Sequence, residues 1–89
     1  MNIKLRIFKA VANEKRLKIL KLLHEKGRMT LREISEIMDI PEATACRNLK
    51  ILENVGLVKS SIYAGIAEYW LNRDKNLTIN EKIINIVLS

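Results

Sequence analysis

The sequence contains little cysteine, histidine and glycine, and each shortage excludes a class of site. A single cysteine, Cys46, cannot form an intrachain disulfide, so nothing indicates an oxidising compartment. One cysteine and one histidine, His24, cannot assemble a zinc-type site within one chain. The three glycines form no phosphate-binding loop, and there is no nucleophile–base pair or carboxylate cluster. We therefore expect no enzyme, no cofactor and no bound metal.

Long apolar segments are absent as well. No stretch approaches the roughly 20 apolar residues of a membrane span. The N-terminal residues MNIKLRIFKA interleave charged and apolar side chains and do not resemble a signal peptide. With 89 residues the chain is long enough for one small domain. We expect a single domain over residues 1–89, in a cytoplasmic protein that makes no membrane contact.

Positive charge is unevenly distributed along the chain. Lysine and arginine number 16 against 10 aspartates and glutamates, which gives a net charge of +6. Residues 1–50 contain 12 basic and 6 acidic residues, whereas residues 51–89 contain four of each, so the whole excess lies in the first part. A basic region of this kind favours an anionic partner, which is either nucleic acid or an acidic surface.

Apolar residues at helical spacing predict most of the chain to be helical. Helix signals divide these segments: Asn13 is a typical N-cap, Gly27 a typical end, and Thr30 with Glu33 forms a capping box. Pro41 fits the first position of a helix that lasts until Gly56, and Thr78 with Glu81 forms a second capping box. The predicted helices are residues 3–12, 14–26, 30–38, 41–55 and 78–89.

After Gly56 the apolar period changes from about 3.6 to about 2. Residues 57–62 and 66–72 are predicted to form two strands joined by a turn at Tyr63–Gly65. Two short helices joined by a tight turn and followed by a hairpin are typical of a winged helix-turn-helix. We therefore predict a mainly α protein with a small β-hairpin (α+β), with about five helices and a two-stranded wing.

In such folds the second helix of the pair enters the DNA major groove, and residues 41–52 suit that role. Ala45, Leu49 and Leu52 occupy one face, while the opposite face is basic. There Arg47 can donate two hydrogen bonds to guanine, and Lys50 suits a phosphate. Including the wing, the predicted DNA-binding residues are Glu42, Ala43, Thr44, Arg47, Asn48, Lys50, Lys59, Ser61 and Tyr63.

Three segments carry a family resemblance: FKAVANEKRLKILKLL, LREISEIMDIPEATACRNLKILENVGLV and the hairpin that ends in EYWLN. Over roughly residues 5–72 the chain resembles the ArsR/SmtB-type bacterial and archaeal repressors. The resemblance is most specific at Leu49–Val58. It implies a winged-helix homodimer that represses transcription and whose first and last helices form the dimer interface. Many members of the family release DNA when a metal binds.

The chain departs from the family at its metal sites and at its wing. The family's Cys-x-Cys positions correspond to Thr30 and Arg32, which cannot bind a soft metal. The family's other site uses Asp, His and Glu on the last helix, but residues 78–89 contain no Asp and no His. The wing tip is apolar, whereas family wings are often rich in arginine. We therefore expect a regulator without the usual metal sensing.

Both terminal helices carry more apolar surface than one stripe requires. Leu5 and Phe8 lie off the stripe of the first helix, and Ile84 lies off that of the last. Such surplus apolar surface usually marks an interface. A two-fold dimer would hide it, place two recognition helices about 34 Å apart and favour a palindromic operator. The predicted interface residues are Ile3, Ile7, Ile79, Ile83, Ile84 and Val87.

Other interpretations remain open at this level. The same fold could serve as a protein-interaction module, or as a sequence-neutral chromatin protein that binds DNA. Cys46 is either a redox switch or a small residue in a serine-like position. Tyr69 and Trp70 alternate on the second strand, so one of them should face the core. The apolar wing tip could insert into the minor groove, bind a partner or simply close a hairpin.

Overall fold

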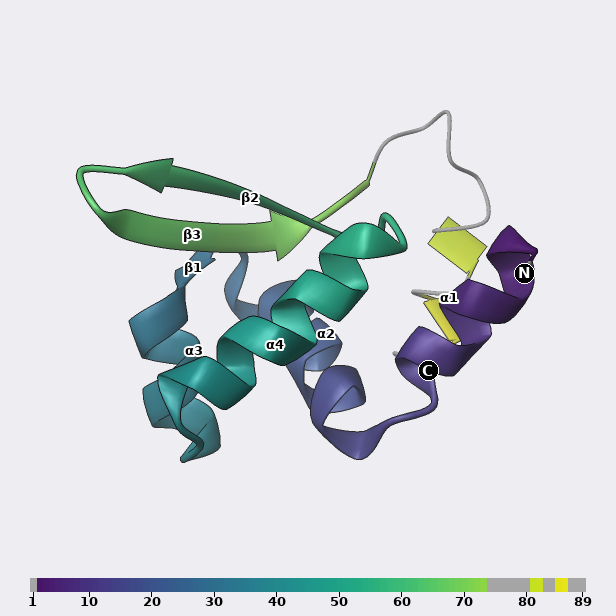
Figure 1. Cartoon of the computed structure of the whole chain (residues 1–89), viewed down its shortest axis with the longest axis horizontal. Helices are drawn as coiled ribbons and strands as arrows, with labels where there is room; N and C mark the ends of the chain where they lie inside the picture. Colours follow the sequence, from purple (N-terminus) through teal and green to yellow (C-terminus); the bar gives the residue numbers. More distant parts are fainter. Residues whose placement is uncertain (1, 74–80, 83–84, 87–89) are drawn as a thin grey trace.

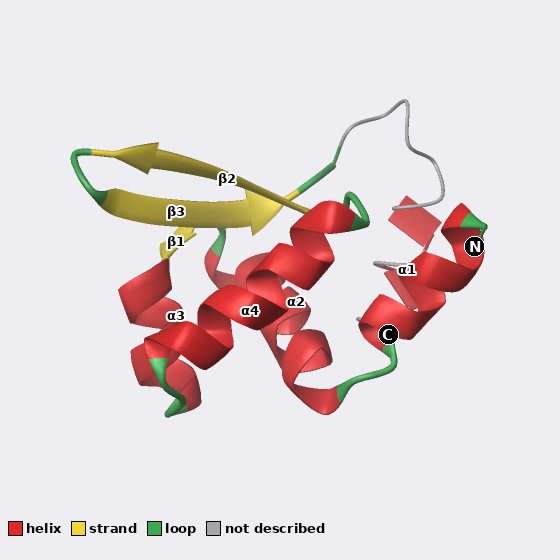
Figure 2. Cartoon of the chain, in the orientation of Figure 1, coloured by secondary structure: helices red, strands yellow, loops and turns green. Residues whose placement is uncertain are grey.

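The computed structural model describes residues 2–73, 81–82 and 85–86, and among these it contains four helices and three strands. The helix-turn-helix and the hairpin predicted from the sequence are confirmed. The sheet lies against one side of the helices, and α1 lies at the end opposite the wing tip (Figures 1 and 2). The elements are α1 (Ile3–Val11), α2 (Glu14–Lys26), β1 (Met29–Thr30), α3 (Leu31–Met38), α4 (Glu42–Asn54), β2 (Val58–Tyr63) and β3 (Ile66–Leu71).

Local capping determines where the helices begin and end. The side chain of Asn13 accepts a hydrogen bond from the backbone N–H of Arg16, which starts α2. Gly27 ends it with a φ of 79°. Both hydrogen bonds of the Thr30–Glu33 capping box form, at 3.1 and 2.9 Å. These predictions are therefore confirmed, and the backbone bond holds the pKa of Glu33 below its usual value.

The first position of α4 is shifted by one residue from the prediction. Pro41 has an extended ψ of 146°, so it is the N-cap and the helix begins at Glu42. The carbonyl of Pro41 nevertheless accepts the first helical hydrogen bond, from Ala45 at 3.0 Å. A fixed proline φ suits the cap and the first turn equally well, so the sequence did not distinguish them.

The sheet has three antiparallel strands in the order β1-β3-β2, where two strands were predicted. The additional strand is β1, in which Met29 pairs with Tyr69 and Thr30 with Glu68. Two residues are too short to show an alternating pattern, so only the tertiary pairing reveals this strand. The β2–β3 hairpin, called the wing below, closes through Ala64 and Gly65, whose positive φ values suit a two-residue turn.

The prediction of a fifth helix falls mostly outside the described residues. Glu81, Lys82, Asn85 and Ile86 are helical. Ile79, Ile83, Ile84 and Val87 of the predicted dimer interface lie outside the described residues, as does Thr78 of the second capping box.

The core lies where the four helices meet one another and the sheet. Its most deeply buried side chains are Ile7, Ile19, Leu20, Leu23, Ile34, Leu49, Leu52, Leu57 and Val58. Tyr69 faces this core, whereas Trp70 is half-buried and lies under the guanidinium of Arg28, 3.9 Å from the ring centre. This answers which of the two aromatic residues is internal.

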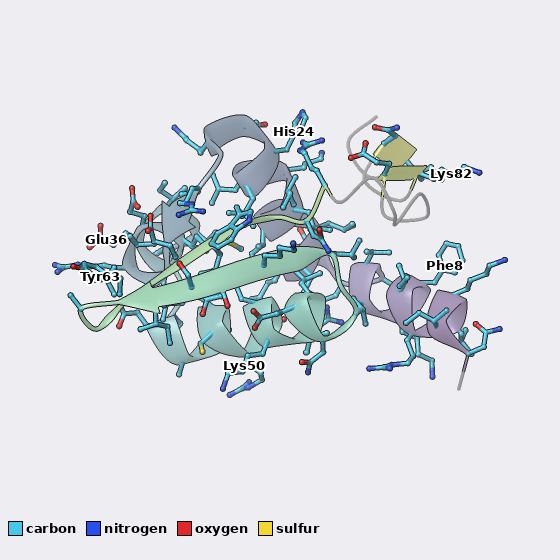
Figure 3. The ribbon with its side chains drawn as sticks, turned by 90° about the horizontal axis from the view of Figure 1, so that it is seen from above. Phe8, His24, Glu36, Lys50, Tyr63 and Lys82 are labelled. Atoms are coloured by element: carbon cyan, nitrogen blue, oxygen red, sulfur yellow. The ribbon has the colours of Figure 1, made fainter. Side chains whose placement is uncertain are left out.

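The structure corrects one predicted interface residue. Ile7 is only 1% exposed and packs in the core of its own chain, so it has no surface to offer a partner. Leu5 and Phe8, which lie off that inward stripe, are about half exposed, and Ile3 is 54% exposed. Figure 3 shows Phe8 pointing away from the body of the protein. The exposed apolar surface of α1 is therefore formed by Ile3, Leu5 and Phe8, and Ile7 is not part of it.

Candidate nucleic-acid interface

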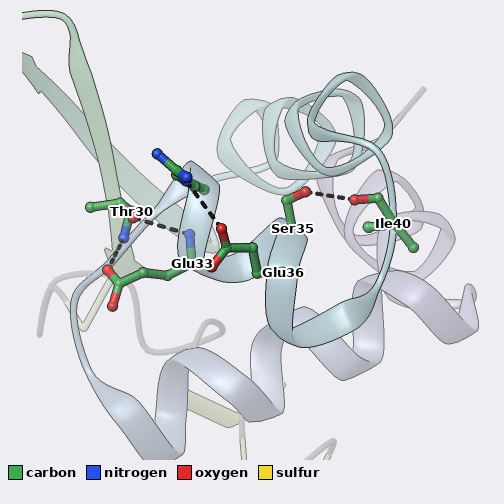
Figure 4. Close-up of polar contacts among 6 residues, drawn as sticks. Thr30, Glu33, Ser35, Glu36 and Ile40 are labelled. Carbon is green, nitrogen blue, oxygen red and sulfur yellow. Dashed lines mark hydrogen bonds and ion pairs between the residues drawn. The ribbon is translucent and has the colours of Figure 1, made fainter.

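The turn between α3 and α4 is fixed by polar contacts within the motif. The Ser35 hydroxyl donates to the carbonyl of Ile40 at 2.6 Å, and the backbone N–H of Ile40 donates to the carbonyl of Ser35 at 3.1 Å (Figure 4). Asp39 adopts the left-handed conformation with a φ of 54°, which aspartate tolerates better than most residues. These contacts set the angle at which α4 leaves α3.

α4 has one buried face and one exposed face. Ala45, Leu49 and Leu52 are fully buried. Four exposed residues, three, four or seven positions apart, form what we call the outer face: Ala43, Arg47, Lys50 and Asn54. The side chain of Lys50 points away from the sheet and the core (Figure 3). Because its inner face holds the helix in the core, the outer face is free to meet a partner.

Two further predicted residues lie at the start of α4. Glu42 is exposed and Thr44 is half-buried. No side chain caps this helix end, so its first backbone N–H groups are unused by a cap. These donors and the small side chains beside them would allow an anionic backbone to approach closely.

The predicted wing residues are all exposed, and they lie on one face of the hairpin. Strand register places Lys59, Ser61 and Tyr63 on the side of the hairpin opposite Ser60. The hydroxyl of Ser60 donates to the carboxylate of Glu53 on α4. The predicted wing contacts therefore lie on the side of the wing turned away from α4.

The tip of the wing is strongly exposed and apolar. Ile62 is 76% exposed, Tyr63 is 85% exposed and Ile66 is 56% exposed. Lys59 is the one basic residue in β2 and β3. The tip therefore offers hydrophobic contact and a phenol, and charge enters only toward the base of the wing.

The central part of the chain matches a described family. Residues 11–61, which include α2, α3 and α4, match the family described as a helix-turn-helix domain. The chain belongs to this helix-turn-helix family.

Two curated relatives of this helix-turn-helix protein are named as regulators. An uncharacterized HTH-type transcriptional regulator of Methanocaldococcus jannaschii is 43% identical over 54 residues, which are 61% of each protein. The cadmium resistance transcriptional regulatory protein CadC homolog of Staphylococcus aureus is 27% identical over 77 residues, which are 86% of this chain and 64% of that protein. The chain thus spans about three-fifths of the length of both relatives.

Solved structures confirm the winged form of the fold. The homodimeric winged helix-turn-helix DNA-binding domain of a possible ArsR-family regulator from Mycobacterium bovis is 26% identical, with a TM-score of 0.79 over 94% of this chain and 77% of that one. HlyU from Vibrio cholerae is 25% identical, with a TM-score of 0.76 over 94% of this chain and 90% of that one. This helix-turn-helix protein therefore shares the winged fold of a possible ArsR-family regulator, in agreement with its sequence resemblance to the ArsR/SmtB type.

One predicted DNA-binding residue of this helix-turn-helix protein, Asn48, is buried in the structure. It is 8% exposed, and its amide donates to the carbonyl of Thr44 at 3.0 Å. Its side-chain oxygen accepts from Arg16 at 3.1 Å. Asn48 lies on the flank of α4 that faces α2, so its amide is occupied within the protein and is not part of the outer face.

Arg16 is a positioning residue that the sequence argument missed. Besides Asn48, its guanidinium donates to the carbonyls of Ala10 and Lys9 at the end of α1. One side chain therefore ties α1, α2 and α4 together. The sequence carries no local signal for this role, because the partners lie 6, 7 and 32 positions away.

The other flank of α4 attaches to the wing. Tyr69 lies beside Cys46 and Glu53, and burial of the phenol, followed by its contacts with the Cys46 thiol and the Glu53 charge, raises the pKa of Tyr69. Cys46 is half-buried at this contact. Together with the Ser60–Glu53 hydrogen bond, this arrangement fixes α4 relative to the hairpin.

The two residues at the positions of the family's thiolate site, Thr30 and Arg32, each interact with a side chain of α3. Thr30 belongs to the capping box of α3, and Arg32 forms an ion pair with Glu36 at 3.0 Å (Figure 4). Within the described part of the chain, no three His, Cys, Asp or Glu side chains gather as metal ligands would. No described helix is long and apolar enough to cross a membrane.

Proposed function

We propose that this helix-turn-helix protein is a sequence-specific DNA-binding transcriptional regulator that acts as a homodimer on a palindromic operator. The observation that carries the proposal is the outer face of α4, which is exposed, contains Arg47 and Lys50, and is held from behind by a fully buried face. A rigid helix with donors on its free side is what the major groove accommodates.

Each residue of the face has a distinct role in this proposal. Ala43 and Thr44 allow the helix to approach the base edges closely. Arg47 donates to guanine O6 and N7, and Lys50 neutralises a phosphate. Glu42 accepts from cytosine N4, which is the base contact that suits a carboxylate. Lys59, Ser61 and Tyr63 contact the backbone where the wing meets the duplex.

The dimer in this proposal forms through α1 and the last helix. Leu5 and Phe8 present apolar surface on α1, and Ile86 in the last segment is 69% exposed. Covering these residues about a two-fold axis removes apolar surface from water and pairs two recognition helices about one DNA turn apart, roughly 34 Å. Ile79, Ile83, Ile84 and Val87 remain predicted members of this interface. The repressor role rests on the resemblance to the ArsR/SmtB-type repressors.

Sedimentation of the chain alone tests the assembly. A stable monomer at tens of micromolar would contradict the dimer and the palindrome together. Phe8→Glu should give monomers that bind DNA poorly, because the charge would have to be buried in the interface. Lys26→Gln at the end of α2 is a matched control, since Lys26 is exposed, lies on another helix and its replacement changes the net charge by the same amount.

A second candidate function is a protein-interaction module, and the exposed apolar wing tip favours it. Ile62, Tyr63 and Ile66 form a hydrophobic surface of the kind that often marks a binding site. Such a module would show little affinity for any duplex. A sequence-neutral chromatin protein, by contrast, would bind every duplex with similar affinity.

Selection of bound sequences from a random pool of duplexes separates these functions. We expect a palindrome to be enriched. A plot of the logarithm of its affinity against the logarithm of the salt concentration should have a slope of about −0.9 for each phosphate that the protein neutralises. Salt-dependent binding without enrichment would indicate the chromatin protein. The absence of duplex binding would indicate the interaction module.

A further inference from the structure

A basic cleft lies between α1, α2 and the end of α4. Its volume is about 260 Å³. Three of its lining residues are basic, no carboxylate lines it, and its floor is apolar. The lining residues are Arg6, Lys9, Ala10, Arg16, Ile51, Asn54 and Val55. Bringing like charges around one concavity is unfavourable unless an anion reduces their repulsion.

The arginines among the described residues differ in whether they have partners within the protein. Arg28, Arg32 and Arg73 each have a glutamate within 4 Å. Arg16 donates to Asn48 and to two carbonyls of α1. Arg6 and Arg47 differ, because no acidic side chain among the described residues forms an ion pair with either. Arg47 lies on the outer face of α4, and Arg6 lines the cleft.

The cleft is continuous with the proposed DNA-binding surface. Asn54 belongs both to the outer face of α4 and to the lining of the cleft. It lies one helical turn beyond Lys50 and two beyond Arg47. A strand of phosphates that follows the outer face toward the end of α4 therefore meets Arg6 and Lys9 of α1 next.

We propose that this cleft binds a backbone phosphate of the DNA, so that α1 is a third DNA-contacting element beside α4 and the wing. The proposal rests on the proposed DNA-binding function. Arg6 supplies a planar pair of donors that matches phosphate oxygens, Lys9 supplies a compact charge, and the Asn54 amide can donate a further bond. The Arg16 contacts hold the end of α1 beside α4, which keeps these groups at a fixed separation.

The role of this contact is to position the protein rather than to read sequence. A phosphate contact carries no base information, but it sets the register of the protein along the duplex. The same contact would link the dimer helix α1 directly to the bound DNA. Both halves of the proposed dimer would then be held on the operator by α1.

The test is the salt dependence of operator binding by the double variant Arg6→Gln and Lys9→Gln. Loss of one phosphate contact per protomer should reduce the magnitude of the log–log slope by about 0.9 per protomer. The preferred sequence should not change, because no base contact is removed. The matched control is Lys21→Gln with Lys26→Gln, which removes two exposed charges of α2 that do not line the cleft. Lys21 lies one turn before His24, which is on the side of the molecule opposite Lys50 (Figure 3).

A charge-retaining variant separates a contact from a folding defect. Arg6→Lys with Lys9→Arg should keep the wild-type slope, and thermal melting and sedimentation of each variant check that fold and assembly are intact. A double glutamine variant that folds, sediments as the wild type does and keeps the full slope would overturn the proposal. An equal loss of slope in the α2 control would also overturn the proposal, because it would show that the slope depends on the net charge of the protein and not on the cleft.

Two further outcomes distinguish the sources of the phosphate and the proposals themselves. Inorganic phosphate titrated against the free protein, followed by the amide signals of Ala10 and Asn54, tests a small-anion site. Saturable binding there, together with an unchanged slope for operator binding, would overturn the DNA contact. If the wild type binds no duplex, the proposed function fails. If the wild type binds an operator and the double glutamine variant keeps the wild-type salt slope, the proposed function stands and the cleft proposal fails.

Discussion

The outer face of α4 and the tip of the wing are both exposed, but they are supported in different ways. The outer face is polar and basic, and each flank of its helix is bonded to the protein, through Arg16 and Asn48 on one side and Glu53 and Ser60 on the other. The wing tip is apolar and projects past α3 (Figure 1). Precise hydrogen bonding needs a fixed helix, whereas apolar contact tolerates small displacements. We infer that specificity lies on α4 and that the tip adds unspecific contact.

The largest effect is expected where the support of α4 is removed. Arg16→Met eliminates the hydrogen bonds to Asn48 and to the end of α1, and should lower the free energy of unfolding by about 2–4 kcal/mol. Denaturant unfolding measures this change. Lys18→Met is the control, because its exposed ion pair with Glu14 should be worth only a few tenths of a kcal/mol. Equal effects of the two variants would show that Arg16 does not anchor α4.

The next effect concerns the reading face itself. Arg47→Ala should weaken specific DNA binding by about 1–3 kcal/mol and relax the preference at one base position. Binding to duplexes with each base substituted at each position measures both quantities. Lys50→Ala should instead weaken binding to all duplexes alike and reduce the salt slope. Unchanged affinity and unchanged preference in Arg47→Ala would remove Arg47 from the reading face.

A smaller effect is expected at the wing tip. Ile62→Ser combined with Tyr63→Ser should weaken operator binding by about 1 kcal/mol or less while the salt slope stays constant, because no charge is removed. Tyr63→Phe keeps the apolar surface and serves as the control. A loss larger than that of Arg47→Ala would reverse the comparison and assign specificity to the wing.

No effect is expected from metals. Because Thr30 and Arg32 occupy the positions of the family's thiolates, stoichiometric zinc, cadmium or arsenite should leave operator affinity unchanged in a binding titration. A metal-dependent loss of affinity that survives Cys46→Ser would contradict this prediction. It would point to carboxylate ligands or to a site shared between two subunits.

The sequence predicted best those features that depend on neighbouring residues. The Asn13 cap and the Thr30–Glu33 box are local hydrogen bonds, and the buried face of α4 follows from apolar spacing along one helix. Apart from the one-residue shift at Pro41, the errors arose at contacts between distant segments. Strand β1 exists because Met29 meets Tyr69, and Asn48 is buried because Arg16 reaches it from α2.

The same limit applies to the candidate site. The sequence argument placed Ile7 in the dimer interface, but packing against the core decided which apolar side chains of α1 remain exposed. Likewise, the alternation of the hairpin was predicted, but only the strand register placed Lys59 and Ser61 on the face turned away from α4. A single sequence specifies the faces of each element more clearly than it specifies which element covers each face.

The strand order β1-β3-β2 leaves β2 at the edge of the sheet, and this affects how the protein behaves in solution. The outer side of an edge strand carries unpaired backbone N–H and C=O groups and can pair with another chain. Lys59 is the single charged residue of β2, and a charge on an edge strand opposes such pairing. Lys59 therefore also protects solubility, and replacing it with a neutral residue would leave a six-residue uncharged edge that is prone to aggregation.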